Sequence, residues 1–209
     1  TPDQLMTNFE TAYGTTDLDA YRDEVLSEGY TFVLQAQTVE EFNLPDELFE
    51  YADELAIAGH MFSGQPNRDG YVLQEIEVQV LQPQGPWLSV SPYDDYFGGI
   101  PGAQVRNYEI LIYFNTLGDH RYEVRGEQLF YVEADTVMHD GAMTPRYRLA
   151  GQLDRSSVGR RSKATVRCSS SSSRCHSKSV RTSGRSRSSA PVWRAKRASA
   201  MVKASKPSA

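Results

Sequence analysis

Cysteine and lysine are both absent from residues 1–154 of this 209-residue chain. Without a thiol, this region can form no disulfide, no cysteine nucleophile and no zinc–thiolate site, and cysteine usage gives no information on its redox compartment. A run of about 18 apolar residues is missing from the whole chain, which excludes a helix that spans a membrane. Phosphate-binding glycine loops, Gly-x-Ser-x-Gly and His-Glu-x-x-His are missing too, so no such motif assigns a reaction.

Positive charge is scarce in the same region. Residues 1–154 hold seven arginines against all 27 acidic residues, a net charge of −20, whereas residues 155–209 hold 15 lysines and arginines, a net charge of +15. Nucleic acids and anionic lipids are bound through lysine and arginine, so we expect neither as a partner of the acidic region. The charge suits a high-salt or calcium-rich setting, or is simply an acidic surface.

Composition divides the chain into a domain, residues 1–155, and a basic Ser/Arg-rich tail, residues 156–209. The tail has too few large apolar side chains to bury a core, so we expect it to be disordered. A genuine tail would contact anionic partners. Alternatively, the abrupt change is typical of GC-rich DNA translated in the wrong frame, which would make the tail a frameshift product. Its thiols and histidine match no common zinc-ligand spacing: Cys168, Cys175 and His176.

The chain begins at Thr1 rather than methionine. A removed export signal and a fragment of a longer protein both fit this start. Localisation therefore stays open between an exported and a cytoplasmic protein.

The N-terminal third predicts three helices. Residues 1–4 have the pattern of a capping box with proline at the first helical position, and Gly14 is expected to end the helix that follows. A second helix begins at residues 16–17 and is expected to end at Gly29, before a strand at residues 30–35. A third begins at residues 43–46.

The third helix carries an apolar stripe at helical spacing that runs from Leu48 through Leu55 to Phe62. After a turn region at residues 64–70, apolar residues recur with a period of two in residues 72–80, 108–114, 122–135 and 146–154. Gly126 is expected to mark a bulge, and residues 139–141 a turn. Alternation with one apolar face predicts an antiparallel sheet covered on one side, and helices followed by strands predict an α+β fold.

Residues 82–102 do not fit this alternation. They combine proline, glycine and aromatic residues over about 20 positions, and a loop of that length is unusual and often functional. We expect a short strand at residues 87–91, followed by a lid-like segment at residues 92–102.

Several phrases resemble the NTF2-like, or SnoaL-like, superfamily. They are Phe9-Glu10-Thr11-Ala12-Tyr13, Asp17-Leu18-Asp19-Ala20-Tyr21, residues 26–32, His60-Met61-Phe62, and residues 122–126, 130–132 and 148–154. The closing strand of the relatives often carries tryptophan where this chain has Gln152, which is a departure. The resemblance covers residues 1–155 and leaves the tail unmatched. It implies a cystatin-like α+β cone, with three N-terminal helices packed on a curved, mostly antiparallel sheet and a ligand-binding pocket inside.

In enzymes of that superfamily an Asp or His in the cone acts as base, and a Tyr or an acid stabilises the oxyanion. The resemblance therefore implies two base candidates, His60 and Asp154. A histidine near a helix end and a polar residue at a strand end are the simpler interpretations of these two residues. The implied ligand-binding residues, which would also fit a plain core, are Tyr13, Phe32, His60, Tyr113 and Tyr131.

The sequence spacing of the possible metal-ligating residues does not match known metal sites. Asp94 and Asp95 offer carboxylates to a hard cation, but no calcium-loop pattern surrounds them and a solvated turn is the simpler interpretation. His120 and His139 fall in predicted turns without partners at ligand spacing. We expect no cofactor and no metal.

Three functions stay open. A non-catalytic domain that binds a small apolar ligand or a protein partner in its cone is favoured, since no tight catalytic constellation is visible. The alternatives are a small-molecule isomerase, dehydratase or cyclase, and a homodimeric assembly module. The superfamily includes all of these kinds of protein, so fold alone decides nothing.

Overall fold

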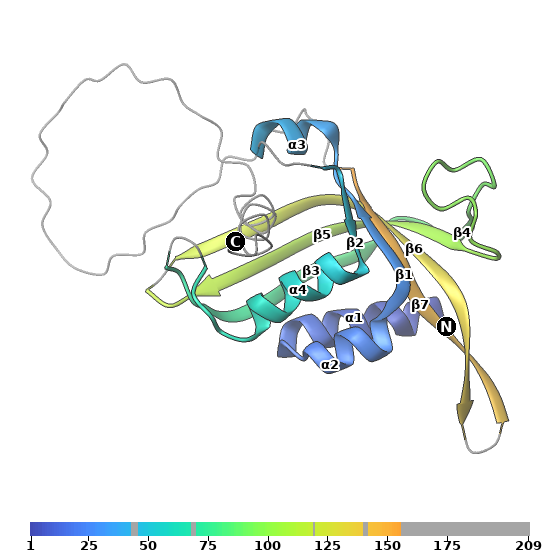
Figure 1. Cartoon of the computed structure of the whole chain (residues 1–209), viewed down its shortest axis with the longest axis horizontal. Helices are drawn as coiled ribbons and strands as arrows, with labels where there is room; N and C mark the ends of the chain where they lie inside the picture. The colour runs from blue at the N-terminus through green and yellow to red at the C-terminus, as the bar shows by residue number, and fades with distance from the viewer. Residues whose placement is uncertain (43–45, 68–69, 119, 140–141, 156–209) are drawn as a thin grey trace, which may run out of the picture.

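The computed structural model describes residues 1–42, 46–67, 70–118, 120–139 and 142–155 (Figure 1). The predicted tail, with its two cysteines and His176, lies outside the described residues. So do positions 140 and 141 of the predicted turn and positions 43–45 at the expected start of the third helix.

A curled, mixed sheet carries the fold. Its strands are β1 (Leu26–Val33), β2 (Leu48–Glu50), β3 (Leu73–Pro83), β4 (Leu88–Ser89), β5 (Gln104–Thr116), β6 (Arg121–His139) and β7 (Ala142–Asp154). They are ordered β2-β1-β7-β6-β5-β3, and β4 pairs with β5. The β1–β7 pair is parallel and the remaining pairs are antiparallel.

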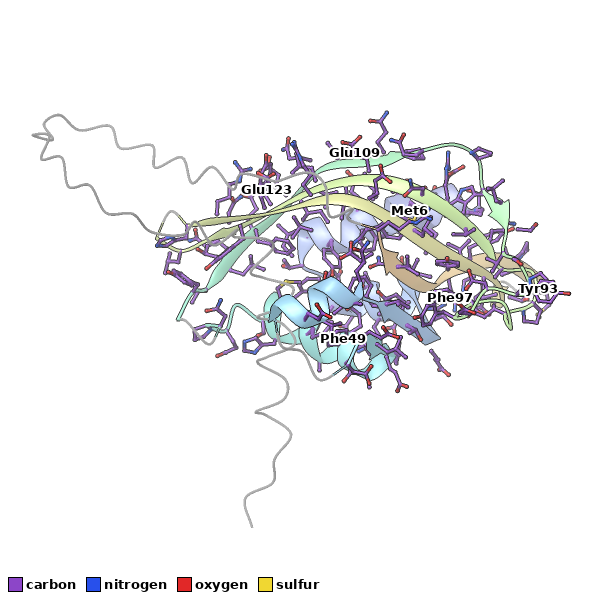
Figure 2. All side chains as sticks on the ribbon, turned by 90° about the horizontal axis from the view of Figure 1, so that it is seen from above. Met6, Phe49, Tyr93, Phe97, Glu109 and Glu123 are labelled. Carbon is purple, nitrogen blue, oxygen red and sulfur yellow. The ribbon has the colours of Figure 1, made fainter. Side chains whose placement is uncertain are left out.

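Helices cover the concave side of this sheet. They are α1 (Pro2–Thr15), α2 (Leu18–Ala20) continued by the π-helical turn η1 (Tyr21–Val25), α3 (Ala36–Phe42) and α4 (Tyr51–Phe62). Figure 2 shows the long strands arched above the helices, with Glu109 and Glu123 on the outer side of the arch. The predicted α+β class with a curved, mostly antiparallel sheet is confirmed. No helix within the described ranges is both long and apolar enough to cross a membrane.

The start of α1 follows the prediction in part. The Gln4 backbone N–H donates to Thr1 Oγ1 at 3.2 Å, but the Gln4 side chain donates to Asn8 at 3.0 Å instead of returning to the cap. Gly14 does not end the helix, which continues to Thr15. Thr16 ends it in the left-handed conformation, at φ 54°. The next helix is capped by Asp17, whose carboxylate accepts from Ala20 N at 2.9 Å.

The predicted boundaries between residues 26 and 50 were wrong. Gly29 lies inside β1, because the strand starts at Leu26, and the short helix α3 was not expected. The long helix begins at Tyr51, because the preceding Leu48–Glu50 forms β2 against β1. Asp46 turns the chain into β2 by accepting hydrogen bonds from the next two backbone N–H groups, at 2.7 and 3.2 Å.

The buried face of α4 is rotated from the predicted stripe. Its buried residues are Glu54, Ile57, Ala58 and Met61, whereas Leu55 is only partly buried against the core. The stripe was misplaced because Leu48 was counted as helical.

The strand predictions from residue 71 are better. The alternation in β5 is confirmed, since Tyr108, Ile110, Ile112 and Phe114 are all buried. Gly126 forms no bulge, because it pairs with Ile110 in an unbroken β5–β6 register. The register shifts instead in the β6–β7 pair: Tyr131 and Val132 pair with Gly151 and Leu149, so Ala150 of β7 is the extra residue. The short strand predicted at residues 87–91 is present as β4.

The loop that follows β4 docks on the outer face of the sheet. Phe97 is 1% exposed, and its ring stacks on Tyr131 with 3.9 Å between centroids. Neighbouring Phe130 points the opposite way, edge-on to Phe9 in the main core at 5.6 Å, because successive side chains of a strand face opposite sides. Figure 2 shows Tyr93 at the tip of the molecule and Phe97 nearer the sheet. Residues 92–102 therefore cover a small satellite core.

Candidate functional site

A cavity of about 30 Å³ lies between the helices and the inner face of the sheet. It is walled mostly by apolar and aromatic side chains from α1, α4 and four strands, together with one carboxylate and two amides. The lining residues are Phe9, Tyr13, Phe32, Glu54, Met61, Ile112, Phe114, Val124, Gln128 and Gln152.

Glu54 is the charged group among these described lining residues. Its side chain is 3% exposed, on the inward face of α4. The Tyr21 hydroxyl donates to Glu54 Oε1 at 3.0 Å, and the Tyr13 hydroxyl lies at 3.4 Å from the same oxygen. Such charge-assisted hydrogen bonds offset part of the cost of removing a carboxylate from water.

Aromatic packing holds the two tyrosine rings in place. Tyr13 stacks on Phe9, one turn earlier in α1, with 4.9 Å between centroids. It also meets Tyr21 edge-on at 5.1 Å and Phe62 of α4 at 5.4 Å. Since rings packed on several sides have little rotational freedom, both hydroxyls are directed at the carboxylate before any ligand arrives.

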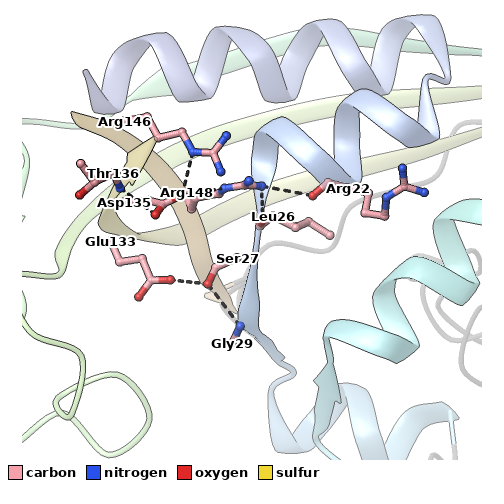
Figure 3. A network of polar contacts seen from close by, with 9 residues as sticks. All are labelled: Arg22, Leu26, Ser27, Gly29, Glu133, Asp135, Thr136, Arg146 and Arg148. Carbon is pink, nitrogen blue, oxygen red and sulfur yellow. Dashed lines mark hydrogen bonds and ion pairs between the residues drawn. The ribbon is translucent and has the colours of Figure 1, made fainter. Parts of the chain in front are cut away.

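The end of η1 is fastened to the last strand (Figure 3). Arg148 of β7 donates to the backbone carbonyl of Leu26 at 2.8 Å and to that of Arg22 at 3.3 Å. Asp135 Oδ2 of β6 accepts hydrogen bonds from Arg146 Nε at 2.7 Å and from Arg148 Nε at 3.3 Å. These contacts fix the turn that begins with Tyr21, so the network supports the position of its hydroxyl.

The same arginines shift the acidity of Asp135. The hydrogen bond from Arg146, aided by the backbone N–H of Thr136 and by Arg148, lowers the Asp135 pKa below its ordinary 3.8, against an opposing effect of burial. Beside this group the Ser27 hydroxyl donates to Glu133, and the Gly29 N–H donates to Ser27 Oγ at 3.2 Å.

Two buried amides complete the cavity wall. Gln128 of β6 is 3% exposed and Gln152 of β7 is 7% exposed. Gln152 stands beside Phe32 of β1 and Phe130 of β6 in the strand registers. Gln152, where the sequence departs from the NTF2-like phrases that it resembles, is thus part of the cavity wall.

The structure brings two of the predicted ligand-binding residues together: Tyr13 and Phe32 line the same cavity. His60 lies on the exposed face of α4 and is not among the lining residues. Tyr113 and Tyr131 point to the outer face of the sheet. The Arg121 guanidinium lies 3.4 Å from the centre of the Tyr113 ring.

The two predicted base candidates differ in burial. Asp154 is 4% exposed at the end of β7 but does not line the cavity, whereas His60 is exposed.

Sequence reasoning missed Glu54. A signal existed, because Glu54 precedes Ile57, Ala58 and Met61 at helical spacing and so had to share their buried face.

The remaining polar candidates have structural partners. Asp94 Oδ1 accepts from the backbone N–H groups of Tyr96 and Phe97 at 3.1 and 2.8 Å, and Oδ2 accepts from the Tyr131 hydroxyl at 3.3 Å. His120 packs edge-on against Tyr71. The His139 side chain lies outside the described part of the chain. No group of three or more His, Cys, Asp or Glu within the described ranges is arranged to hold a metal ion.

Neither a protein-family model nor a curated protein matches this sequence. The fold is similar to the crystal structure of a conserved protein from Planctomyces limnophilus, at 12% identity over 73% of this chain and 90% of that one, with a TM-score of 0.46. It is also similar to a proposed aromatic ring hydroxylase from Novosphingobium aromaticivorans, at 14% identity over 72% of this chain and 82% of that one, with a TM-score of 0.44.

Proposed function

We propose that residues 1–155 are an NTF2-like cone that binds a small, mostly apolar molecule beside Glu54 without chemically changing it. One observation carries the proposal: a buried carboxylate, held by two tyrosine hydroxyls, stands in the wall of a cavity whose other lining is mostly apolar. Small-ligand sites have this composition, with an apolar wall and a few polar groups that fix orientation.

The hydrogen bonds favour binding over catalysis. A tyrosine hydroxyl has a single hydrogen to donate, and in Tyr13 and Tyr21 that hydrogen is directed at Glu54. An oxyanion in the cavity would therefore have to compete with Glu54 for these donors. The histidine proposed as a base lies on the exposed face of α4.

An isomerase, dehydratase or cyclase is the second candidate, because the Glu54 side chain lines the cavity. In that case Glu54, rather than His60 or Asp154, would accept the substrate proton. Proton transfer needs the base within about 2.6–3.2 Å of the proton's carrier atom, directly or through one water. The homodimeric module stays a prediction, which light scattering on the full chain tests.

A cavity-filling variant tests the binding proposal. Small neutral compounds that suit a cavity of about 30 Å³, such as ethanol, acetonitrile and 1-propanol, are screened against the full chain by ligand-observed NMR and thermal shift. Ile112→Phe should fill the cavity and weaken binding at least tenfold. Tyr113→Phe changes the next residue, on the outer face, and should leave binding unchanged. The proposal fails if neither these compounds nor the amine tested below binds, or if both variants weaken binding equally.

A further inference from the structure

The cavity joins one negative charge to several aromatic rings. Glu54 supplies the carboxylate, and the rings that line the same space are those of Phe9, Tyr13, Phe32 and Phe114. The face of an aromatic ring carries partial negative charge and attracts cations, most strongly in a desolvated site. The Glu54 carboxylate therefore favours a cationic ligand, and any ring face that the ligand reaches favours the same sign of charge.

We infer that the ligand of this cavity carries a protonated amine, seated between the Glu54 carboxylate and the surrounding aromatic rings. This inference rests on the proposed function and names the class of ligand. It excludes carboxylates and phosphates, which Glu54 would repel.

The hydrogen-bonding capacity of the wall fits an ammonium group. A primary ammonium has three hydrogens to donate. The polar side chains that line the cavity are the Glu54 carboxylate, which accepts from Tyr21 and Tyr13, and the buried amides of Gln128 and Gln152, each with one acceptor oxygen. An ammonium group in the cavity would meet these three polar side chains, from α4, β6 and β7.

Size limits the head group. A volume of about 30 Å³ exceeds the roughly 10–15 Å³ that one water needs, so a methylammonium-sized group fits without opening the fold. The field of the whole domain acts in the same direction. Residues 1–154 carry a net charge of −20, which raises the local concentration of cations and repels anions.

A set of ligands with the same carbon chain provides the test: propylamine, 1-propanol and propionate. Binding to the full chain is measured by isothermal titration and ligand-observed NMR at pH 7. We expect propylamine to bind at least tenfold more tightly than 1-propanol, and propionate not to bind. Glu54→Gln should reduce propylamine affinity at least tenfold and leave 1-propanol affinity unchanged.

Glu123→Gln is the matched control, because it removes the same charge from the exposed outer face of β6. It should change propylamine affinity less than twofold. An equal loss of affinity in both variants would overturn the inference, because it would show only long-range electrostatic attraction.

If Glu54→Gln does not fold, the comparison of propylamine with 1-propanol on the natural chain decides. Equal or tighter binding of 1-propanol, or of the neutral compounds above, refutes the amine while the binding proposal stands. Binding of none of these compounds refutes both.

Discussion

Each face of the sheet carries a hydrogen bond from a tyrosine hydroxyl to a carboxylate, but the two pairs lie in different surroundings. On the inner face, the Tyr21 hydroxyl donates to Glu54 at 3.0 Å; on the outer face, the Tyr131 hydroxyl donates to Asp94 at 3.3 Å. Glu54 belongs to a helix and borders a cavity. Asp94 belongs to a loop, and its other oxygen accepts from two N–H groups of that loop. The same tyrosine–carboxylate pair can therefore border a possible binding site or fasten a loop, depending on whether a cavity lies beside it.

The outer pair, Tyr131 and Asp94, should depend strongly on the neighbouring ring of Phe97. Phe97→Ala removes a ring that is 1% exposed, and we expect it to cost about 3–5 kcal/mol of unfolding free energy. Tyr93→Ala, in the same loop, removes a ring that is 92% exposed and should change stability by less than about 0.5 kcal/mol. Urea melts of both variants measure this, and similar losses would show that Phe97 does not fasten the loop.

Gly151 should tolerate no side chain. A Cβ there would lie 2.2 Å from the Phe97 ring and 2.5 Å from the Thr31 carbonyl oxygen. Gly151→Ala should therefore cost about 3 kcal/mol, the upper part of the usual range for overpacking. Gly29→Ala is the control in β1, where the nearest atom lies at 3.9 Å. It should be nearly neutral in the same melts, and equal effects would contradict close packing at Gly151.

Alkaline pH should weaken the outer pair, Tyr131 and Asp94. Burial first, and Asp94 second, raises the pKa of Tyr131 from 10.0 to about 12. The folded state thus holds this proton more tightly than the unfolded state. Its contribution to stability is complete below pH 10 and is lost as the pH rises through about 12. At pH 11 the loss should be about 1.4 kcal/mol.

Tyr131→Phe isolates this effect. The natural chain should be more stable than the variant at pH 9, and the difference should shrink by that amount at pH 11. Urea melts at the two pH values measure it. A difference that stays constant would mean that Tyr131 titrates as an ordinary tyrosine.

Asp135→Asn should give the smallest effect, on the network that fastens η1. Its partly exposed ion pairs with two arginines are worth less than about 1 kcal/mol. Because the pKa of Asp135 is lowered on folding, its contribution is present above pH 3.8 and is lost as the pH falls through the folded value. In melts at pH 7 and pH 3, the difference in stability between variant and natural chain should be smaller at pH 3 than at pH 7.

Local signals predicted much of the fold. The Thr1 cap, the Asp17 helix start and the alternation of β5 all depend on residues a few positions apart, and the structure contains all three. The strand β2 was missed because it depends on pairing with β1, and the short helix α3 was missed as well. The parallel β1–β7 pair was not predicted, because no short pattern marks which distant strands will meet.

The candidate site was less predictable than the fold. Tyr13 and Phe32, two of the predicted ligand-binding residues, line the cavity because both sit on inward faces, and their binding role stays a prediction. The Tyr21–Glu54 and Tyr13–Glu54 hydrogen bonds join residues 33 and 41 positions apart, which no spacing rule reveals. Glu54 itself was hidden by the wrong helical register of α4.

The contacts of Arg148 also constrain how the chain is made. Its hydrogen bonds to the carbonyls of Arg22 and Leu26 span 126 and 122 residues. During synthesis, α1, η1 and β1 exist long before β7, and until then β1 has β2 as its only strand partner in the sheet of the described residues. Pairing over such separations slows folding and leaves apolar surfaces open meanwhile. A ribosome-bound chain stopped before residue 142 should therefore still be open to proteases at its N-terminal helices.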